Sequence, residues 1–286
     1  MTQGRRRSDS PRTGTRVPTH PAASPGAHMS IRVIKIGGRV QVDPRLPAAI
    51  VGATQKPGVR VAVVHGGGDE VSALQRTMGL EPTFIGGRRV TSAAALDAVR
   101  MVLSGTINKR LVAQLQGAGA RAVGVSGEDG GLLTARLADA QLGRVGRDVF
   151  AEASLIAHLL NGDWLPVISP LARERDSETG EGLNVNGDDA AAAIAAGLAA
   201  DELLFIADVP GVLEDGVLLP SLDLDAAQSL CERGVAQGGM RAKLEAAVMA
   251  LRNGVRNVRI VALEGITNRA AGTTITLSAS ASRDHQ

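Results

Sequence analysis

Short runs of β-branched and aliphatic residues alternate with longer helical stretches along most of this 286-residue chain. Such alternation favours parallel strands, because each parallel connection needs a crossover, which is usually a helix. The runs are almost continuously apolar, as is typical of strands that are covered on both faces. The sequence therefore predicts an α/β fold: a three-layer sandwich with a central, mostly parallel sheet. The expected strands are 31–36, 60–65, 121–126, 164–168, 202–207 and 257–261. The expected helices are 44–54, about 68–78, 92–117, 155–161, 188–200 and 239–252, and a hairpin is expected within 171–186.

The composition narrows the possible partners. The chain has three Phe, one Trp and no Tyr, so its core must consist mainly of Ala, Val, Leu and Ile. Binding of single-stranded nucleic acid usually needs aromatic platforms for base stacking, and these are scarce here. The net charge of +2 conceals a basic amino-terminal segment: residues 1–28 carry five Arg and one Asp. We therefore expect no nucleic-acid partner for the folded part of the chain.

Residues 1–29 are expected to lie outside the fold. They are rich in Pro, Ser, Thr, Gly and Arg and lack a hydrophobic period, which predicts a disordered tail or an upstream extension before Met29. No apolar run is long enough to span a bilayer, so no membrane partner is expected. The single cysteine, Cys231, excludes an internal disulfide and fits a reducing compartment. We expect a cytoplasmic protein.

Two predicted strands end in glycine turns, Lys35–Gly38 and His65–Gly68. Glycine lets backbone amides approach an anion closely, and the amino end of a following helix favours negative charge. The two turns could therefore hold a phosphate chain at the carboxyl edge of the sheet. Neither turn matches a P-loop or a dinucleotide fingerprint. A lysine at a strand end is often only a snorkelling surface group, but beside a glycine turn it is also suited to phosphate oxygens.

Further polar residues stand beside other predicted turns. Asn184 and Asn186 alternate on an extended stretch, so both could donate to one ligand, although a helix cap explains them as well. Asp188 follows and could hold lysine ammonium groups. Lys243 is placed near the start of a helix, where the dipole disfavours a cation, and a bound anion would offset that cost. Asp208 follows a buried strand in a turn.

Paired guanidinium groups precede the helix at 92–117. Arginine is well suited to bidentate carboxylate binding, and Arg89 is the candidate, because surface charge explains Arg88 equally well. His65 is expected to hydrogen-bond its own turn. The histidines do not have metal-ligand spacing, so no metal held by His or Cys is expected.

These segments, in this order, resemble the amino-acid kinase family, most closely its members that phosphorylate N-acetylglutamate. The similarity spans about residues 31–275 and is carried by IKIGG, VVHGGG, GRRVT, VLSGTINKRLV, GVSGEDGG, NVNGDDAAAAIA, ADVPGVL and GGMRAK. The resemblance implies an N-terminal lobe (30–185) that binds the acyl amino acid and a C-terminal lobe (186–286) that binds ATP with Mg²⁺. It implies transfer of the γ-phosphoryl group of ATP to the γ-carboxylate of N-acetylglutamate, as in arginine biosynthesis.

The resemblance also assigns expected roles to single residues. Lys35 and Lys243 would stabilise the transferring phosphoryl group, with Asp188 organising the two lysines. The residues expected to bind the substrate are Gly67, Gly68, Arg89 and Asn184. The residues expected to face the nucleotide are Gly37, Gly38 and Asp208, and all four of these glycines could offer amides to phosphates.

Several positions depart from the family pattern. They are the segment 39–41, Ala207, Gly187 and an abbreviated stretch at 262–272. The glycine at position 187 resembles the residue found in related kinases that act on carrier-protein-linked aminoadipate or glutamate. That activity is the alternative function. A non-catalytic ligand sensor of the same fold is a further alternative. The abbreviated stretch and the lack of an amphipathic amino-terminal helix predict weak or absent inhibition by arginine, and a homodimer is expected.

Overall fold

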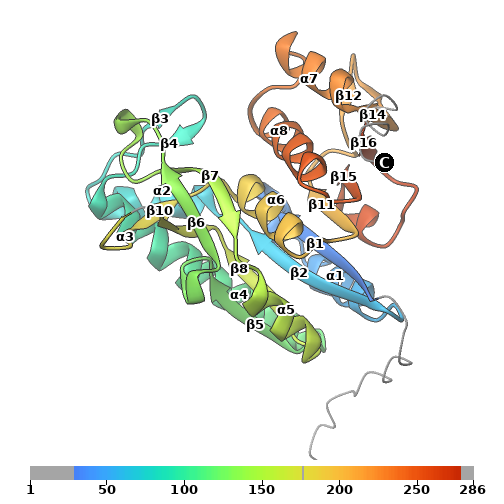
Figure 1. Ribbon diagram of the computed structural model, residues 1–286, viewed down its shortest axis with the longest axis horizontal. Helices are drawn as coiled ribbons and strands as arrows, with labels where there is room; N and C mark the ends of the chain where they lie inside the picture. The colour runs from blue at the N-terminus through green and yellow to red at the C-terminus, as the bar shows by residue number, and fades with distance from the viewer. Residues whose placement is uncertain (1–28, 176, 278–286) are drawn as a thin grey trace, which may run out of the picture.

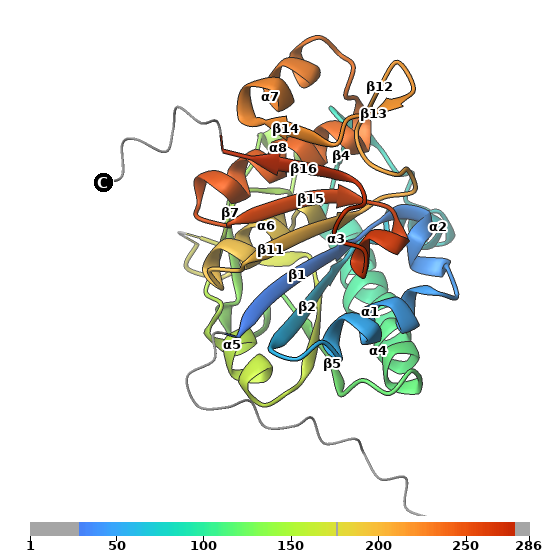
Figure 2. The same cartoon turned by 90° about the vertical axis from the view of Figure 1, so that its right-hand side faces the viewer.

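A single large sheet forms the centre of the computed structural model, which describes residues 29–175 and 177–277 (Figures 1 and 2). Neighbouring strands are parallel, except that β16 runs antiparallel to β15 and β14 follows the direction of β16. The strand order is β14 (Ser221–Asp223), β16 (Thr273–Thr276), β15 (Asn257–Val261), β11 (Glu202–Ile206), β1 (Ser30–Ile36), β2 (Val59–His65), β8 (Leu165–Ser169) and β5 (Ala122–Ser126).

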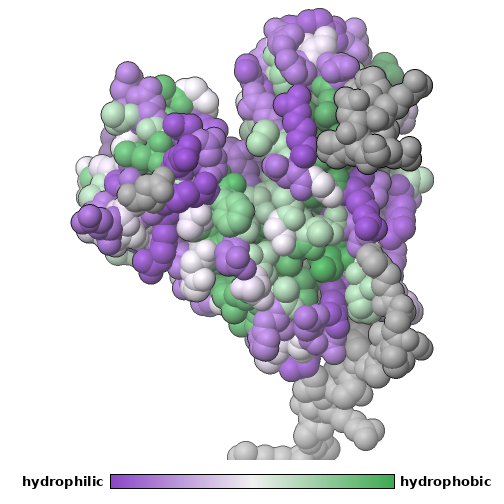
Figure 3. Space-filling model, viewed as in Figure 1, coloured by the Kyte–Doolittle hydropathy of each residue, from purple (hydrophilic) through white to green (hydrophobic). Residues whose placement is uncertain are grey.

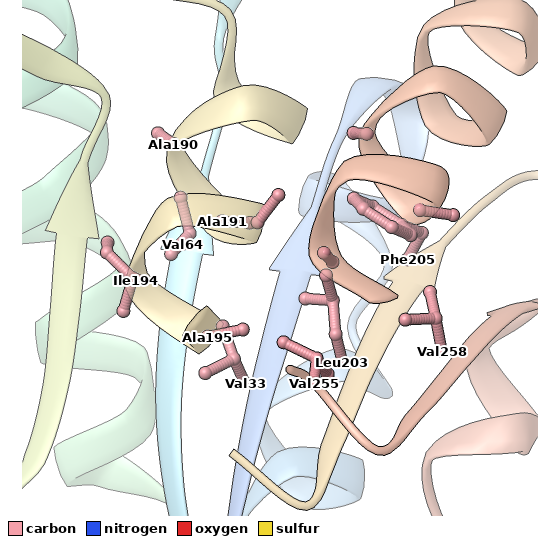
Figure 4. Close-up of a cluster of buried hydrophobic side chains, with 14 of the residues drawn as sticks. Val33, Val64, Ala190, Ala191, Ile194, Ala195, Leu203, Phe205, Val255 and Val258 are labelled. Carbon is pink, nitrogen blue, oxygen red and sulfur yellow. The ribbon is translucent and has the colours of Figure 1, made fainter. Parts of the chain in front are cut away.

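Helices cover both faces of this sheet, because both faces of its central strands are apolar. On β1, Val33 points to one face and packs in the same cluster as Ile194 of α6 (Gly187–Gly197), as Figure 4 shows. Ile34 points to the other face, into a cluster with Ile50 of α1 (Leu46–Thr54). The first face is completed by α5 (Ser154–Asn161) and α8 (Gly238–Arg252), and the second by α4 (Asn108–Gly117). The predicted three-layer α/β sandwich is confirmed.

A second, four-stranded sheet lies beside the first. Its order is β10 (Gly182–Asn184), β9 (Leu171–Glu174), β6 (Leu133–Leu137) and β7 (Gly146–Ala151). The antiparallel pair β9–β10 is the hairpin that the sequence predicted within 171–186. The sequence analysis did not predict β6 and β7. Two further pairs stand apart as hairpins: β3 (Phe84–Ile85) with β4 (Arg88–Arg89), and β12 (Leu213–Glu214) with β13 (Val217–Leu218).

The long helical stretch expected at 92–117 is present, but it is not uniform. It consists of α3 (Ala93–Arg100), the π-helical segment η2 (Met101–Ile107) and α4. The helix α2 (Gly68–Thr77) follows β2 as expected, and α1 begins two residues later than predicted. The short helix α7 (Leu224–Glu232), which contains the buried Cys231, was not predicted.

Two further expectations concern the amino-terminal residues and the absence of a membrane-spanning helix. The predicted disordered tail falls on residues 1–28, which lie outside the described residues, and on Met29. Among the helices of the described part, none has both the length and the hydrophobicity needed to cross a bilayer.

Candidate active site

The two glycine turns and the Asp208 turn meet at one edge of the central sheet. They follow β2, β1 and β11, which are adjacent parallel strands, so their carboxyl ends are side by side. The molecular surface is hollowed between the part that holds the β3–β4 hairpin and the part that holds α7 and α8 (Figure 3). This is the arrangement in which open α/β sheets bind ligands.

Lys35, Asp188 and Lys243 form one buried cluster. The Lys35 Nζ lies 2.7 Å from Asp188 Oδ1, and the Lys243 Nζ lies 3.5 Å from Asp188 Oδ2. Lys35 is 6% exposed and Asp188 is 4% exposed. The predicted grouping of two ammonium groups around Asp188 is therefore present, although the three residues come from β1, α6 and α8.

One carboxylate between two ammonium groups leaves an excess of positive charge. Burial lowers the pKa of Lys243 below its usual value, and the nearby Lys35 ammonium lowers it further, while Asp188 and Asp208 oppose both effects. A bound anion would relieve this repulsion, because it would supply the missing negative charge. The cluster is thus suited to a phosphoryl group.

Local backbone structure explains why these side chains converge. Asp188 lies in the first turn of α6, where Asn186 is the N-cap and its side-chain oxygen accepts a hydrogen bond from the Asp188 amide at 2.8 Å. Asn186 therefore caps the helix. The expectation that Asn184 and Asn186 could both donate to one ligand does not hold for Asn186. Lys243 lies in the second turn of α8, which begins at Gly238, one residue earlier than predicted. Its cost from the helix dipole is smaller than expected, because that effect is strongest in the first turn.

Two glycines leave room for the Lys35 side chain. A Cβ at Gly37 would lie 2.7 Å from the Lys35 Nζ, and a Cβ at Gly187 would lie 3.2 Å from its Cε. The second position is one of the departures from the family pattern. Both glycines border the path that the lysine takes to Asp188.

The second glycine turn is fixed by packing. Gly67 has a φ of +153°, and a Cβ there would lie 2.1 Å from Ile107 Cδ1 in η2. Only glycine fits, because a side chain would be strained as well as in collision. The helix α2 starts at the next residue without a side-chain cap, so its first amides can serve an anion.

A cavity of about 150 Å³ collects the predicted substrate residues. Gly67, Gly68, Arg89 and Asn184 all line it. The remaining wall is largely apolar and consists of Val71, Val99, Leu103, Pro170 and Val185. The sequence did not reveal this wall, because its residues come from four separate segments, with Val99 and Leu103 on one continuous helical stretch. An apolar wall opposite a guanidinium group and an amide suits a small organic acid.

Arg89 is held by α2. Its Nη2 donates to the Gly68 carbonyl oxygen at 2.7 Å and to Ser72 Oγ at 2.8 Å, and its Nη1 donates to Gln75 Oε1. Burial lowers the pKa of the Arg89 guanidinium below its usual value. The supporting residues Ser72 and Gln75 were not predicted, because nothing in their spacing distinguishes them from other polar residues of an amphipathic helix.

Asn184 is linked to Arg89 through Thr91. The Asn184 side-chain amide donates to Thr91 Oγ1 at 3.1 Å, and that hydroxyl donates to the Arg89 carbonyl oxygen at 2.9 Å. Thr91 stands in the GRRVT segment, so the segment was recognised although the role of its threonine was not.

His65 is a structural group, as expected. Its Nδ1 donates to the Gly66 carbonyl oxygen at 2.9 Å, and its Nε2 accepts from the Asn108 amide at 3.2 Å. Burial lowers the pKa of His65 to about 4, so the imidazole is neutral near pH 7. This hydrogen bonding ties the glycine turn to α4.

The predicted nucleotide-side residues lie at the same sheet edge but outside the cavity lining. Gly37 and Gly38 follow β1, and Asp208 is exposed after β11, close enough for its charge to raise the pKa of Lys243. Within the described residues, no group of three His, Cys, Asp or Glu side chains is placed to hold a metal ion.

Comparison with known proteins agrees with the family resemblance found in the sequence motifs. Residues 30–262 match the sequence model of the Amino acid kinase family. The chain is 43% identical over 240 residues to an acetylglutamate kinase of Chloroflexus aurantiacus, covering 83% of this chain and 94% of the relative. It is also 43% identical over 232 residues to an acetylglutamate kinase of Geobacillus stearothermophilus, covering 80% and 88%. Among solved structures, N-acetylglutamate synthase of Neisseria gonorrhoeae, complexed with coenzyme A and N-acetylglutamate, superimposes with a TM-score of 0.74 at 27% identity. That match covers 88% of this chain and 60% of the other.

Proposed function

The chain belongs to the amino acid kinase family, and we propose that it is an N-acetylglutamate kinase. The reaction transfers the γ-phosphoryl group of ATP to the γ-carboxylate of N-acetyl-L-glutamate and gives N-acetylglutamyl phosphate and ADP. The observation that carries this proposal is the Lys35–Asp188–Lys243 cluster at the same sheet edge as a cavity that Arg89 and Asn184 line. Relatives above 40% identity that carry this name favour it over the alternatives.

In the proposed reaction, a carboxylate oxygen of the substrate attacks the γ-phosphorus while the bond to the β–γ bridging oxygen breaks. The carboxylate is already ionised, so no general base is required, and catalysis depends on positioning and charge. Lys35 and Lys243 would neutralise the negative charge on the transferring group and on the leaving ADP. Asp188 would keep both ammonium groups in place between turnovers.

The substrate and the nucleotide would approach from different sides. Arg89 and Asn184 would bind the carboxylate and neighbouring groups of the acyl amino acid in the 30–185 lobe. Gly37, Gly38 and Asp208 would face ATP, which the 186–286 lobe would bind. Magnesium would enter with ATP as part of the MgATP substrate, because phosphate oxygens are the hard ligands that it prefers, and would neutralise part of the phosphate charge.

One observation supports the alternative, a carrier-linked substrate. Gly187 borders Lys35, and this glycine is shared with kinases that act on carrier-linked aminoadipate or glutamate. The curated relatives, however, are named acetylglutamate kinases. We therefore propose the free acetylated amino acid as the substrate. We also propose a role in arginine biosynthesis, a cytoplasmic location and a homodimer, as expected from the sequence.

The test is a direct substrate comparison. Purified enzyme with MgATP is given either free N-acetylglutamate or a carrier-linked aminoadipate, and acyl phosphate is trapped as a hydroxamate. Rapid hydroxamate formation with free N-acetylglutamate is expected. Turnover only of the carrier-linked substrate would assign the alternative, and ligand binding without turnover of either substrate would favour a sensor.

A further inference from the structure

The β3–β4 hairpin has little apolar packing of its own. Its tip, Gly86 and Gly87, has φ values of +57° and +77°, as a tight two-residue turn requires. Within the described residues it pairs with no other strand, and Phe84 and Ile85 are 53% and 45% exposed. An isolated two-stranded hairpin is marginally stable. The position of the hairpin is therefore fixed from outside it, by the backbone hydrogen bonds of Thr91 with Leu142 and Arg144 just after β4 and by side-chain contacts with neighbouring elements.

Two adjacent arginines supply such contacts in opposite directions. Successive residues of a strand point to opposite faces. Arg89 accordingly reaches α2, where it donates to the Gly68 carbonyl oxygen and Ser72, while Arg88 reaches α6, where its Nη2 lies 3.6 Å from Asp189 Oδ2. The hairpin is thus joined to α2 and α6, two of the helices that border the cavity, near their amino ends.

Arg88 favours the ionised form of the Asp189 carboxyl group. The groups that act on its carboxyl are Asp188 from α6, Glu245 from α8, Lys35 from β1 and Arg88 from β4. Burial raises the pKa of Asp189 to about 6, Asp188 and Glu245 act in the same direction, and Arg88 is the largest opposing influence. An acid in the first turn of a helix also favours the dipole, but Asp188 already fills that role.

We propose that Arg88 and Asp189 are positioning residues that fasten the β3–β4 hairpin beside the acyl-amino-acid cavity and so keep Arg89 in place. The inference rests on the proposed function for the identity of the substrate. Breaking the pair would loosen the strand that carries Arg89, while the Lys35–Asp188–Lys243 cluster would stay intact. The affinity for the acyl amino acid should therefore fall without a matching loss of turnover.

A double-mutant cycle tests the pairing. Arg88→Gln and Asp189→Asn should each raise KM for N-acetylglutamate roughly twofold to fivefold, the size expected for losing one partly exposed ion pair worth up to about 1 kcal/mol. The kcat and the KM for ATP should change by less than about twofold. The double variant should be no worse than either single variant, because both remove the same interaction. Additive losses, or an unchanged KM, would overturn the proposal.

A matched control and a second readout separate this role from general stability. Arg233 forms a similar partly exposed pair with Glu214 at 2.9 Å, in the part of the molecule that holds α7. Arg233→Gln should leave KM for N-acetylglutamate unchanged. Hydrogen exchange of residues 84–91 in the substrate-free enzyme should become faster in Arg88→Gln and stay unchanged in Arg233→Gln. Unchanged exchange in Arg88→Gln would refute the fastening even if the substrate assignment were wrong. Inactivity of the wild type with N-acetylglutamate would refute only the function.

Discussion

A single methyl group at Gly37 should disable the enzyme without unfolding it. Gly37 has φ −139° and ψ 165°, an extended conformation that alanine adopts without strain. A Cβ there would lie 2.7 Å from the Lys35 Nζ, well inside normal contact distance. The ammonium group is the free end of a flexible chain, so it can move aside at little cost in stability. Its position relative to Asp188 is what the substitution changes.

The expected size of the effect follows from this distance. Restoring a normal contact requires the Lys35 Nζ to move by about 0.8–1.3 Å, since carbon prefers neighbours at about 3.5–4 Å. That movement disturbs an ion pair that is 2.7 Å long. A misplacement of about 1 Å at a reacting centre can cost roughly a hundredfold in rate. Gly37→Ala should therefore lower kcat about tenfold to a hundredfold, while the free energy of unfolding changes by less than about 1 kcal/mol.

The assay is steady-state hydroxamate formation together with urea unfolding. Gly52→Ala in α1 is the control, because its Cβ would meet only Thr267 Cγ2, at 3.9 Å, and activity should stay at the wild-type level. The decisive comparison starts from the Lys35→Met variant. Adding Gly37→Ala to that variant should cause little further loss of kcat. An equal further loss in that background would show that the methyl group obstructs the nucleotide directly, and the reasoning from Lys35 would be refuted.

Three further predictions follow from other parts of the molecule. Lys243→Ala should lower kcat by roughly two decades or more in the hydroxamate assay, and near-full turnover would contradict its role. Folding raises the pKa of Asp189 from 3.8 to about 6, so its protonation stabilises the folded chain. The free energy of unfolding of the wild type relative to Asp189→Asn should therefore fall as the pH rises from about 4 through 6, and a flat difference in urea titrations would contradict the burial argument. Arginine should inhibit weakly or not at all, because the stretch at 262–272 is abbreviated, and inhibition at micromolar concentration in the hydroxamate assay would refute this.

The sequence predicted the central sheet well because its strands are buried on both faces. Val33 and Ile34 pack into different clusters, so no polar alternation interrupts the apolar run. The strand β7 was missed for the opposite reason. Its residues Arg147, Asp148 and Phe150 are exposed, and pairing with the preceding strand β6 and packing on α6 make it a strand. The helix α7 did carry a usable signal, since Asp223 is its N-cap and accepts from the Ala226 amide at 2.7 Å.

The individual residues of the candidate site could be predicted from the sequence, but the contacts between them could not. Glycine turns and isolated lysines each have a structural explanation, and the resemblance to a family brought Lys35, Lys243 and Asp188 into one hypothesis. The link from Asn184 through Thr91 to Arg89, and the pairing of Arg88 with Asp189, join segments that are far apart in the sequence. No local pattern could indicate these contacts, because a sequence motif marks single residues and does not show which distant residue each of them meets.

The charge balance of the buried cluster explains why its empty and occupied states should differ. Asp188 neutralises only one of the two ammonium groups, and burial together with the nearby Lys35 ammonium lowers the pKa of Lys243. The γ-phosphate of ATP would supply the missing negative charge, so its binding should raise the pKa of Lys243. Because the protein holds both lysines in place beforehand, little reorganisation remains when charge develops on the transferring group. The same arrangement predicts that Asp188 is needed for activity: without it, two ammonium groups would face each other, and we expect the lysines to separate before the nucleotide arrives.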